Sequence, residues 1–266
     1  KGVSRLEASP HDANRVYLAL TGYREDDFQT YLFRSRDRGL TWEPISGNLP
    51  AESVNVVRED PEMARLLYIG TDQGGVYASA DDGATWSSLC ADLPPVAIHD
   101  LAVQTEEDEL VAATHGRGVF TLDIIPVRAA TPEVFAGAGH LFGIKPARRP
   151  ESRDYRGDWI WETLRPAAIH FFFREAVRST VTILNAEGNP VKTFDCEARA
   201  GINSVSWDLA PDVPPAPAAV YPAARAMAKA GRYKVVIKGG GTVLTGSFEV
   251  LDPDVAPATE KRGLSG

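Results

Sequence analysis

One eight-residue pattern occurs twice in the chain. Ser, Asp, Gly, Thr and Trp occupy the same five positions in SRDRGLTW, residues 35–42, and in SADDGATW, residues 79–86. Trp42 and Trp86 lie 44 residues apart, and two later prolines, Pro50 and Pro94, keep the same spacing. Chance does not produce two such coincidences, so the chain contains a structural unit that occurs at least twice.

Short apolar or alternating runs surround both copies and predict β-strands. The runs are RVYLAL (15–20) and TYLFRS (30–35), then VNVVRED (54–60), RLLYIGT (65–71) and GGVYASA (74–80), then HDLAVQ (99–104), ELVAATHG (109–116) and GVFTLD (118–123). Four short strands per unit at this period favour a β-propeller blade over a helical solenoid. We therefore predict an all-β fold in which residues 1–125 form the last blades of a propeller, two with the repeated pattern and a terminal one without it.

Turn chemistry explains why these residue types recur. The glycine of each copy can adopt the positive φ that a tight hairpin between the third and fourth strands requires. The aspartate can accept backbone N–H groups within the turn, and the Ser and Thr hydroxyls add further hydrogen bonds. We expect each tryptophan to point into the seam between neighbouring sheets. The pattern thus assigns structural roles to Ser35, Asp37, Gly39, Thr41, Trp42, Ser79, Asp81, Gly83, Thr85 and Trp86.

The pattern Ser-x-Asp-x-Gly-x-Thr-Trp resembles the Asp-box of the BNR-repeat families, which include sialidases, sortilin-type receptors and xyloglucan-cleaving hydrolases. The resemblance extends from Val3 to about Ile125 and implies the blades of a β-propeller. In those families the Asp-box is structural and lies on the face opposite the active site. The resemblance therefore implies no catalytic role for Asp37 or Asp81.

Residues 166–253 lack the repeat and are predicted to form an antiparallel β-sandwich. The turn sequences NAEGN (185–189) and KGGGT (238–242) join alternating runs and indicate two hairpins. The segments ILNAEGNPVKTF, GINSVSWDL and AGRYKVVIK resemble the immunoglobulin-like module of the flagellar hook-capping family, which implies an immunoglobulin-like sandwich. Trp207 is expected in the core between its two sheets.

Three further segments complete the predicted organisation. Residues 126–165 form a linker, in which Tyr155, Trp159 and Trp161 are expected to anchor the sandwich to the propeller rather than to bind a sugar or a partner. A Pro- and Ala-rich insertion of unassigned role occupies residues 210–230, and residues 254–266 form a tail.

Function in propellers usually resides on the face formed by the loops between the second and third strands and between successive blades. The chain offers residues 21–30, 70–75 and 113–118 at equivalent places on that face. Three carboxylates there are candidates for acid–base catalysis of glycoside hydrolysis: Asp26, Asp27 and Asp72. Adjacent carboxylates rarely face each other across a substrate, so a solvated acidic loop is the preferred interpretation. The candidates for ligand binding are Tyr23, Arg24, His115 and Arg117.

Composition restricts the partners. The net charge of −8 argues against nucleic acid and against anionic membrane surfaces. No apolar run reaches the length of a membrane span, and no ligand spacing indicates a metal or another cofactor. Propellers close with about four blades or more. The expected partners are therefore upstream propeller blades of the same protein or of a partner chain, and the expected ligand is a polysaccharide or a peptide.

Together these features predict the C-terminal part of a secreted or periplasmic bacterial Asp-box protein. Its expected role is non-catalytic binding or scaffolding, because folding alone explains the visible residues. Two alternatives stay open: the rear part of a sialidase- or xyloglucanase-like glycoside hydrolase with its catalytic residues largely upstream, and a sortilin-like peptide-binding receptor. A carboxylate pair with a raised pKa in a cleft would favour the hydrolase, and an apolar tunnel would favour the receptor.

Overall fold

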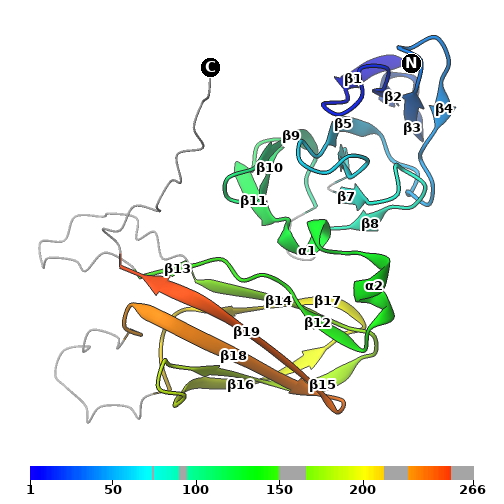
Figure 1. Cartoon of the computed structure of the whole chain (residues 1–266). Helices are drawn as coiled ribbons and strands as arrows, with labels where there is room; N and C mark the ends of the chain where they lie inside the picture. Colours follow the sequence, from blue (N-terminus) through cyan, green and yellow to red (C-terminus); the bar gives the residue numbers. More distant parts are fainter. Residues whose placement is uncertain (74, 90–94, 150–165, 213–226, 253–266) are drawn as a thin grey trace, which may run out of the picture. The chain divides into compact units, whose positions relative to one another are not determined.

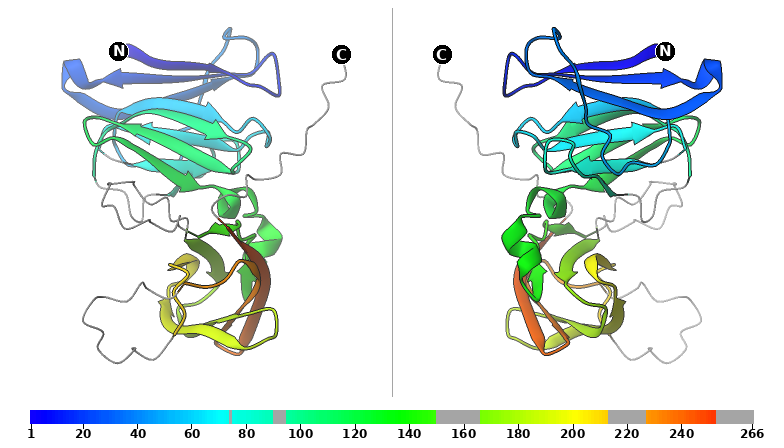
Figure 2. Two further views of the ribbon diagram at one scale, coloured as in Figure 1. Left: turned by 90° about the vertical axis from the view of Figure 1, so that its left-hand side faces the viewer. Right: turned by 90° about the vertical axis from the view of Figure 1, so that its right-hand side faces the viewer.

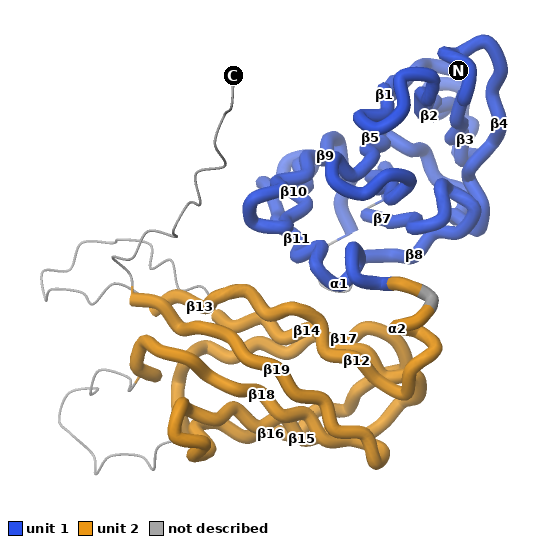
Figure 3. The backbone as a smooth tube through the Cα atoms, in the orientation of Figure 1, with its two compact units in different colours: residues 1–130 blue, residues 131–266 orange. Residues whose placement is uncertain are grey.

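The computed structural model describes residues 1–73, 75–89, 95–149, 166–212 and 227–252. The chain divides into two compact units, Lys1–Ala130 and Thr131–Gly266 (Figure 3). Nearly all regular secondary structure in the described residues of both units is β-strand, which confirms the predicted all-β fold (Figure 1). No helix in the described ranges is long and apolar enough to cross a membrane.

The first unit contains three antiparallel sheets, each built from strands that are consecutive in sequence. The first sheet comprises β1 (Gly2–Ala8), β2 (Val16–Gly22), β3 (Asp27–Ser35) and β4 (Glu43–Pro44), with the 3-10 helix η1 (Tyr23–Glu25) between β2 and β3. The second comprises β5 (Val54–Glu59), β6 (Leu67–Thr71), β7 (Val76–Ser79) and β8 (Ser87–Ser88). The third comprises β9 (Ile98–Gln104), β10 (Glu109–Thr114) and β11 (Val119–Asp123), and α1 (Ile125–Arg128) follows it. This up-and-down order of short strands is that of propeller blades.

The second unit is a sandwich of two sheets. One sheet has the order β12-β14-β17, and the other has the order β13-β19-β18-β15-β16. Its elements are α2 (Pro132–Ala136), β12 (Gly139–Leu141), β13 (Ala147–Arg148), β14 (Ala167–Phe173), β15 (Val177–Leu184), β16 (Pro190–Ala198), β17 (Gly201–Trp207), β18 (Gly231–Gly239) and β19 (Thr242–Leu251). The hairpins β15–β16 and β18–β19 pair antiparallel and confirm the two predicted turns.

The core of the sandwich is centred on Trp207, as predicted. Its side chain is 1% exposed, and its ring lies 5.4 Å from that of Tyr233 and 6.1 Å from that of Phe248. The proposed anchors Tyr155, Trp159 and Trp161 lie outside the described residues, as do positions 213–226 of the insertion and the tail. Their roles stay predictions.

The sheet β5–β8 is buried on both faces. One face packs against the first sheet in a cluster that includes Val54, Val57, Leu67, Ile69 and Trp86 with Tyr17, Ala19, Leu32 and Ile45. The other face packs against the third sheet in a cluster that includes Val56, Tyr68 and Val76 with Ile98, Leu101, Leu110 and Ala112. Figure 2 shows the strands of these sheets in two side views. Burial on both faces explains why β6, with the sequence LYIGT, does not alternate between apolar and charged residues, since all its residues are buried.

The two repeated tryptophans differ in burial. Trp86 is 4% exposed in the seam between the first and second sheets, and its Nε1 donates to the carbonyl of Ile45 at 2.9 Å. Its backbone N–H donates to Oδ1 of Asn48 at 2.7 Å, and Nδ2 of Asn48 donates to its carbonyl at 3.0 Å. Trp42 is 38% exposed. Trp86 thus lies in a seam between two sheets, whereas the seam position of Trp42 stays a prediction, because no described sheet covers the outer side of the first sheet.

We expect Trp86→Ala to destabilise the first unit by about 3 kcal/mol or more, because it removes a buried ring and leaves a cavity between two sheets. Trp42→Ala is the matched control, and it should cost clearly less because its ring already contacts solvent. Urea unfolding of both variants followed by circular dichroism measures the difference. Equal losses would contradict the assignment of Trp86 as the seam residue.

Candidate functional site

The two repeated turns, residues 35–42 and 79–86, form the same hydrogen bonds. In the second turn, the N–H of Gly83 donates to Ser79 Oγ at 2.8 Å, while the N–H and hydroxyl of Thr85 donate to the two oxygens of Asp81 at 2.8 and 2.6 Å. In the first turn, Gly39 and Thr41 form the same three hydrogen bonds, at 2.7, 2.8 and 2.6 Å. Gly39 and Gly83 have φ values of 89° and 88°, the left-handed conformation predicted for them.

The carboxylates of both turns are held ionised. Hydrogen bonds from the hydroxyl and N–H of Thr41, joined by Ser35, lower the pKa of Asp37. Partial burial acts to raise the pKa of Asp81, but hydrogen bonds from Thr85 and Ser79 outweigh it and the pKa is lowered. These carboxylates bind their own turns, so their geometry supports a structural role.

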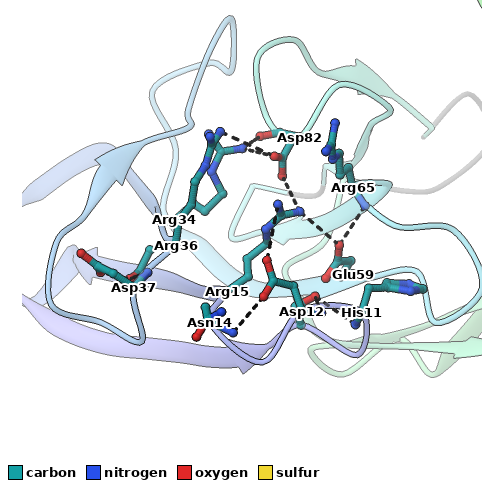
Figure 4. A network of polar contacts seen from close by, with 12 residues as sticks. His11, Asp12, Asn14, Arg15, Arg34, Arg36, Asp37, Glu59, Arg65 and Asp82 are labelled. Carbon is teal, nitrogen blue, oxygen red and sulfur yellow. Dashed lines mark hydrogen bonds and ion pairs between the residues drawn. The ribbon is translucent and has the colours of Figure 1, made fainter.

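A buried polar network crosses the seam beside the second turn (Figure 4). Arg34 on β3 contacts the carboxylate of Asp82 at 2.5 Å and donates to its carbonyl at 2.7 Å. Arg34 also contacts Glu43 at 2.7 Å, while Arg15 lies 3.7 Å from Asp82 and 3.9 Å from Glu59. Arg34, Glu59 and Asp82 are all buried, and buried charges are stable only when paired in this way.

The backbone of the turn directs Asp82 into this network. Asp82 has a φ of 62°, and its N–H donates to the carbonyl of Arg65 at 3.2 Å. Burial acts to lower the pKa of Arg34, but the hydrogen bonds to Asp82 and Glu43 raise it, so the guanidinium stays charged. The network ties two blades together and is explained by folding.

A second charged cluster fixes α1 to the second sheet. Arg128 donates to both carboxylate oxygens of Asp60, at 2.9 and 3.0 Å, and its Nη1 contacts Glu62 at 2.8 Å and Asp108 at 2.5 Å. Asp60 is fully buried and also accepts the hydroxyl of Tyr68 at 3.0 Å. This bidentate pair closes the end of the first unit and is again structural.

A third set of ion pairs joins the first strands of the three blades. Arg5 on β1 contacts Asp100 on β9 at 2.5 Å, although the two residues are far apart in sequence. Arg58 on β5 contacts Asp100 at 3.0 Å and Glu7 at 2.5 Å. Sequence reasoning missed these residues because they lie within strands rather than in loops or motifs.

The candidate residues of the first blade lie on the hairpin between β2 and β3. Tyr23 and Arg24 belong to η1 and are exposed, and Asp26 ends η1 with a φ of 54°. Asp27 begins β3, forms an ion pair with Lys1 and accepts the hydroxyl of Tyr31 at 2.8 Å. The contact with Lys1 is the main reason that the pKa of Asp27 falls to about 2.

The other candidates belong to separate loops. Asp72 follows β6 and accepts from Nδ2 of Asn55 at 3.3 Å. His115 follows β10, and its ring lies 4.9 Å from that of His99, a neighbour that sequence reasoning missed. Arg117 is exposed, and its N–H donates to the Thr114 hydroxyl at 3.2 Å. The structure therefore places each candidate at the strand ends predicted for it, and their joint action in one site stays a prediction.

The chemistry available to the described residues is limited. Every described carboxyl whose pKa departs from its usual value has it lowered: Glu25, Asp27, Asp37, Asp81, Glu133 and Asp212. A general acid in glycoside hydrolysis needs a raised pKa instead. Within the described ranges, no three His, Cys, Asp or Glu side chains form a group that could hold a metal ion.

Comparison with known proteins relates the chain to glycoside hydrolases. No protein-family model matches the chain. It is 39% identical over 98 residues to the xyloglucanase Xgh74A of Acetivibrio thermocellus, a match that covers 33% of this chain and 12% of that enzyme. A xyloglucanase of a Paenibacillus species is 39% identical over 98 residues, with 33% of this chain and 10% of the enzyme covered. A solved GH74 enzyme from Niastella koreensis aligns with a TM-score of 0.38 and 17% identity over 62% of this chain and 24% of that chain.

The matched stretch is therefore a small fraction of each curated relative. About a third of this chain is thus similar in sequence to a part of each xyloglucanase.

The lowered pKa of Asp81 predicts how stability depends on pH. A carboxyl with a lowered folded pKa stabilises the protein above its unfolded pKa of about 4, and this contribution is lost as the pH falls through the folded pKa. We expect Asp81→Asn to cost about 1 kcal/mol at pH 7 and less at pH 3. Urea unfolding at both pH values measures this. Asp26→Asn is the matched control on an exposed loop, and an Asp81→Asn deficit that is equal at both pH values would contradict the assignment.

Proposed function

We propose that the chain is part of a polysaccharide-processing propeller protein and that its blades bind a β-glucan of the xyloglucan type. The observation that carries the proposal is the 39% identity to xyloglucanases of two organisms. It favours the glycoside hydrolase alternative over the non-catalytic scaffold that we expected from the sequence. A polysaccharide of this size does not cross membranes, so the proposed place of action is secreted or periplasmic.

The hairpin between β2 and β3 is the proposed binding surface. It carries two exposed aromatic side chains, Tyr23 at 56% and Phe28 at 47% exposure. An aromatic ring offers a flat apolar face to the C–H groups of a sugar ring, and the Tyr hydroxyl can hydrogen bond at its rim. Arg24 and Asp26 lie on the same hairpin and supply a donor and an acceptor for sugar hydroxyls.

The proposed role of the chain within the hydrolase is to hold the substrate. Asp27 is ionised and paired with Lys1, so it has no proton to give to a leaving group. Asp26 and Asp72 are exposed to solvent, whereas a catalytic general acid of this kind lies in an apolar pocket. We therefore assign the acid–base pair to another part of the parent protein.

Affinity electrophoresis of the full chain in gels that contain xyloglucan tests the proposal, with dextran gels as the control polymer. We expect retardation by xyloglucan, and Tyr23→Ala should weaken binding about tenfold through loss of a stacking ring. Phe135→Ala on α2 is the matched control, because it removes an exposed ring from the other unit.

Two results would count against the proposal. Wild-type chain that migrates equally in both gels would overturn the binding function. Release of reducing ends from xyloglucan by the purified chain would instead contradict the assignment of the acid–base pair to another part of the protein.

A further inference from the structure

Because the first two sheets repeat each other in sequence, each residue on the outer side of the first sheet has a counterpart in the second. Residues of β5 and β6 correspond to residues 51 positions earlier on β1 and β2, and residues after the hairpin correspond at 44 positions. Val54, Val57 and Trp86 are 0%, 0% and 4% exposed in the seam. Their counterparts Val3, Leu6 and Trp42 are 67%, 61% and 38% exposed. The first sheet therefore shows to solvent the same kind of surface that the second sheet buries.

This surface is continuous across the strands. Leu6 pairs with Leu18, and Leu18 pairs with Phe33, so three apolar side chains form a row on one face of the sheet. Leu18 and Phe33 correspond to Ile69 and Tyr77, both of which contribute to the buried seam cluster. We call this surface the outer face; its members are Val3, Leu6, Val16, Leu18, Phe33 and Trp42.

The seam between the first and second sheets shows which residues cover such a face. On the first sheet, Tyr17, Ala19 and Leu32 pack against the second sheet. The segment after β4 approaches the Asp-box turn so closely that a Cβ on Gly47 would lie 2.5 Å from the carbonyl oxygen of Ala84. A Cβ on Gly83 would likewise lie 2.7 Å from Cβ of Ile45.

At the first Asp-box turn, no described segment occupies the place that Ile45 takes beside Gly83. A Cβ on Gly39, the counterpart of Gly83, would meet only the ring of Trp42, at 3.4 Å. Trp86 makes three hydrogen bonds to the segment after β4, through Ile45 and Asn48. Among the described residues, Trp42 makes no counterpart of these bonds.

We propose that the outer face binds a further Asp-box blade, which supplies a Tyr-x-Ala or Tyr-x-Gly strand. Counted from its own Trp, this blade also supplies a carbonyl three residues later and, six residues later, an amide or carboxylate oxygen that accepts the backbone N–H of Trp42. The existing seam has this chemistry in Tyr17, Ala19, Ile45 and Asn48. The proposal is independent of the polysaccharide ligand.

A second copy of this chain does not match this description. The segment of Ile45 and Asn48 already binds Trp86 in each copy. The third sheet turns Leu110 and Ala112 towards the second sheet, and Val119 of β11 is 65% exposed. However, β11 continues into α1, so the segment that would receive Trp42 has no counterpart there.

A chain with residues 1–51 copied in front of Lys1 tests the proposal, because this keeps the spacing of the repeat. The added copy carries Trp42→Phe, so that the remaining Trp42 peptide reports only the original blade. We expect hydroxyl-radical footprinting with mass spectrometry to show that Trp42 loses reactivity, from its value in the 266-residue chain down to that of Trp86. Asn48→Ala in the added copy is the matched control and should restore part of the reactivity.

Two results would contradict the proposal. Trp42 that stays reactive while Trp86 and Trp207 stay protected would overturn the proposal. A second chain has residues 1–95 copied in front of Lys1, again with Trp42→Phe in the copy. Its added part contains two complete blades and the seam between them, so it tests the protection of Trp42 where the shorter copy does not fold. Self-association of the 266-residue chain with protection of Trp42 would make a second copy the occupant and would also overturn it.

Discussion

The first unit depends on how one indole ring is accommodated between two sheets. A buried Trp is stable only when its ring N–H finds an acceptor, and Trp86 finds the carbonyl of Ile45. The same turn that delivers Trp86 also delivers Asp82, which pairs with Arg34 across the seam. Apolar burial and charge pairing thus come from one short segment. The central sheet is fixed by this segment on one side and by the apolar cluster around Ile98 and Leu101 on the other.

Much of the fold is predictable because its signals are local and periodic. A glycine that needs a positive φ, an aspartate that binds its own turn and a spacing repeated along the chain all lie within one stretch of sequence, as Gly83 and Asp81 illustrate. Trp207 is predictable for a related reason, since a large apolar ring on an alternating strand belongs on its inner face.

The remaining features depend on contacts that the sequence does not specify. Nothing near Arg34 indicates that its partner is Asp82, and nothing near Arg128 points to Asp60, since both pairs exist only after the strands have assembled. Trp42 shows the limit most clearly: its local sequence matches that of Trp86, yet its burial is decided by what lies across the sheet. The loops that carry the candidate binding residues are unpredictable in the same sense, because separate strand ends bring Tyr23, Asp72 and His115 to the surface without contacts that define one site.

The close approach of Gly47 to Ala84 also bears on how such a protein diverges. At that edge the backbones of two blades are in contact, so an inserted residue, or even a methyl group, has nowhere to go. The hairpins between the second and third strands differ in length instead, since Val16–Ser35 is longer than its counterpart Leu67–Ser79. In these two blades, added length therefore enters at the hairpin between the second and third strands, while the segment around Gly47 has no room for it.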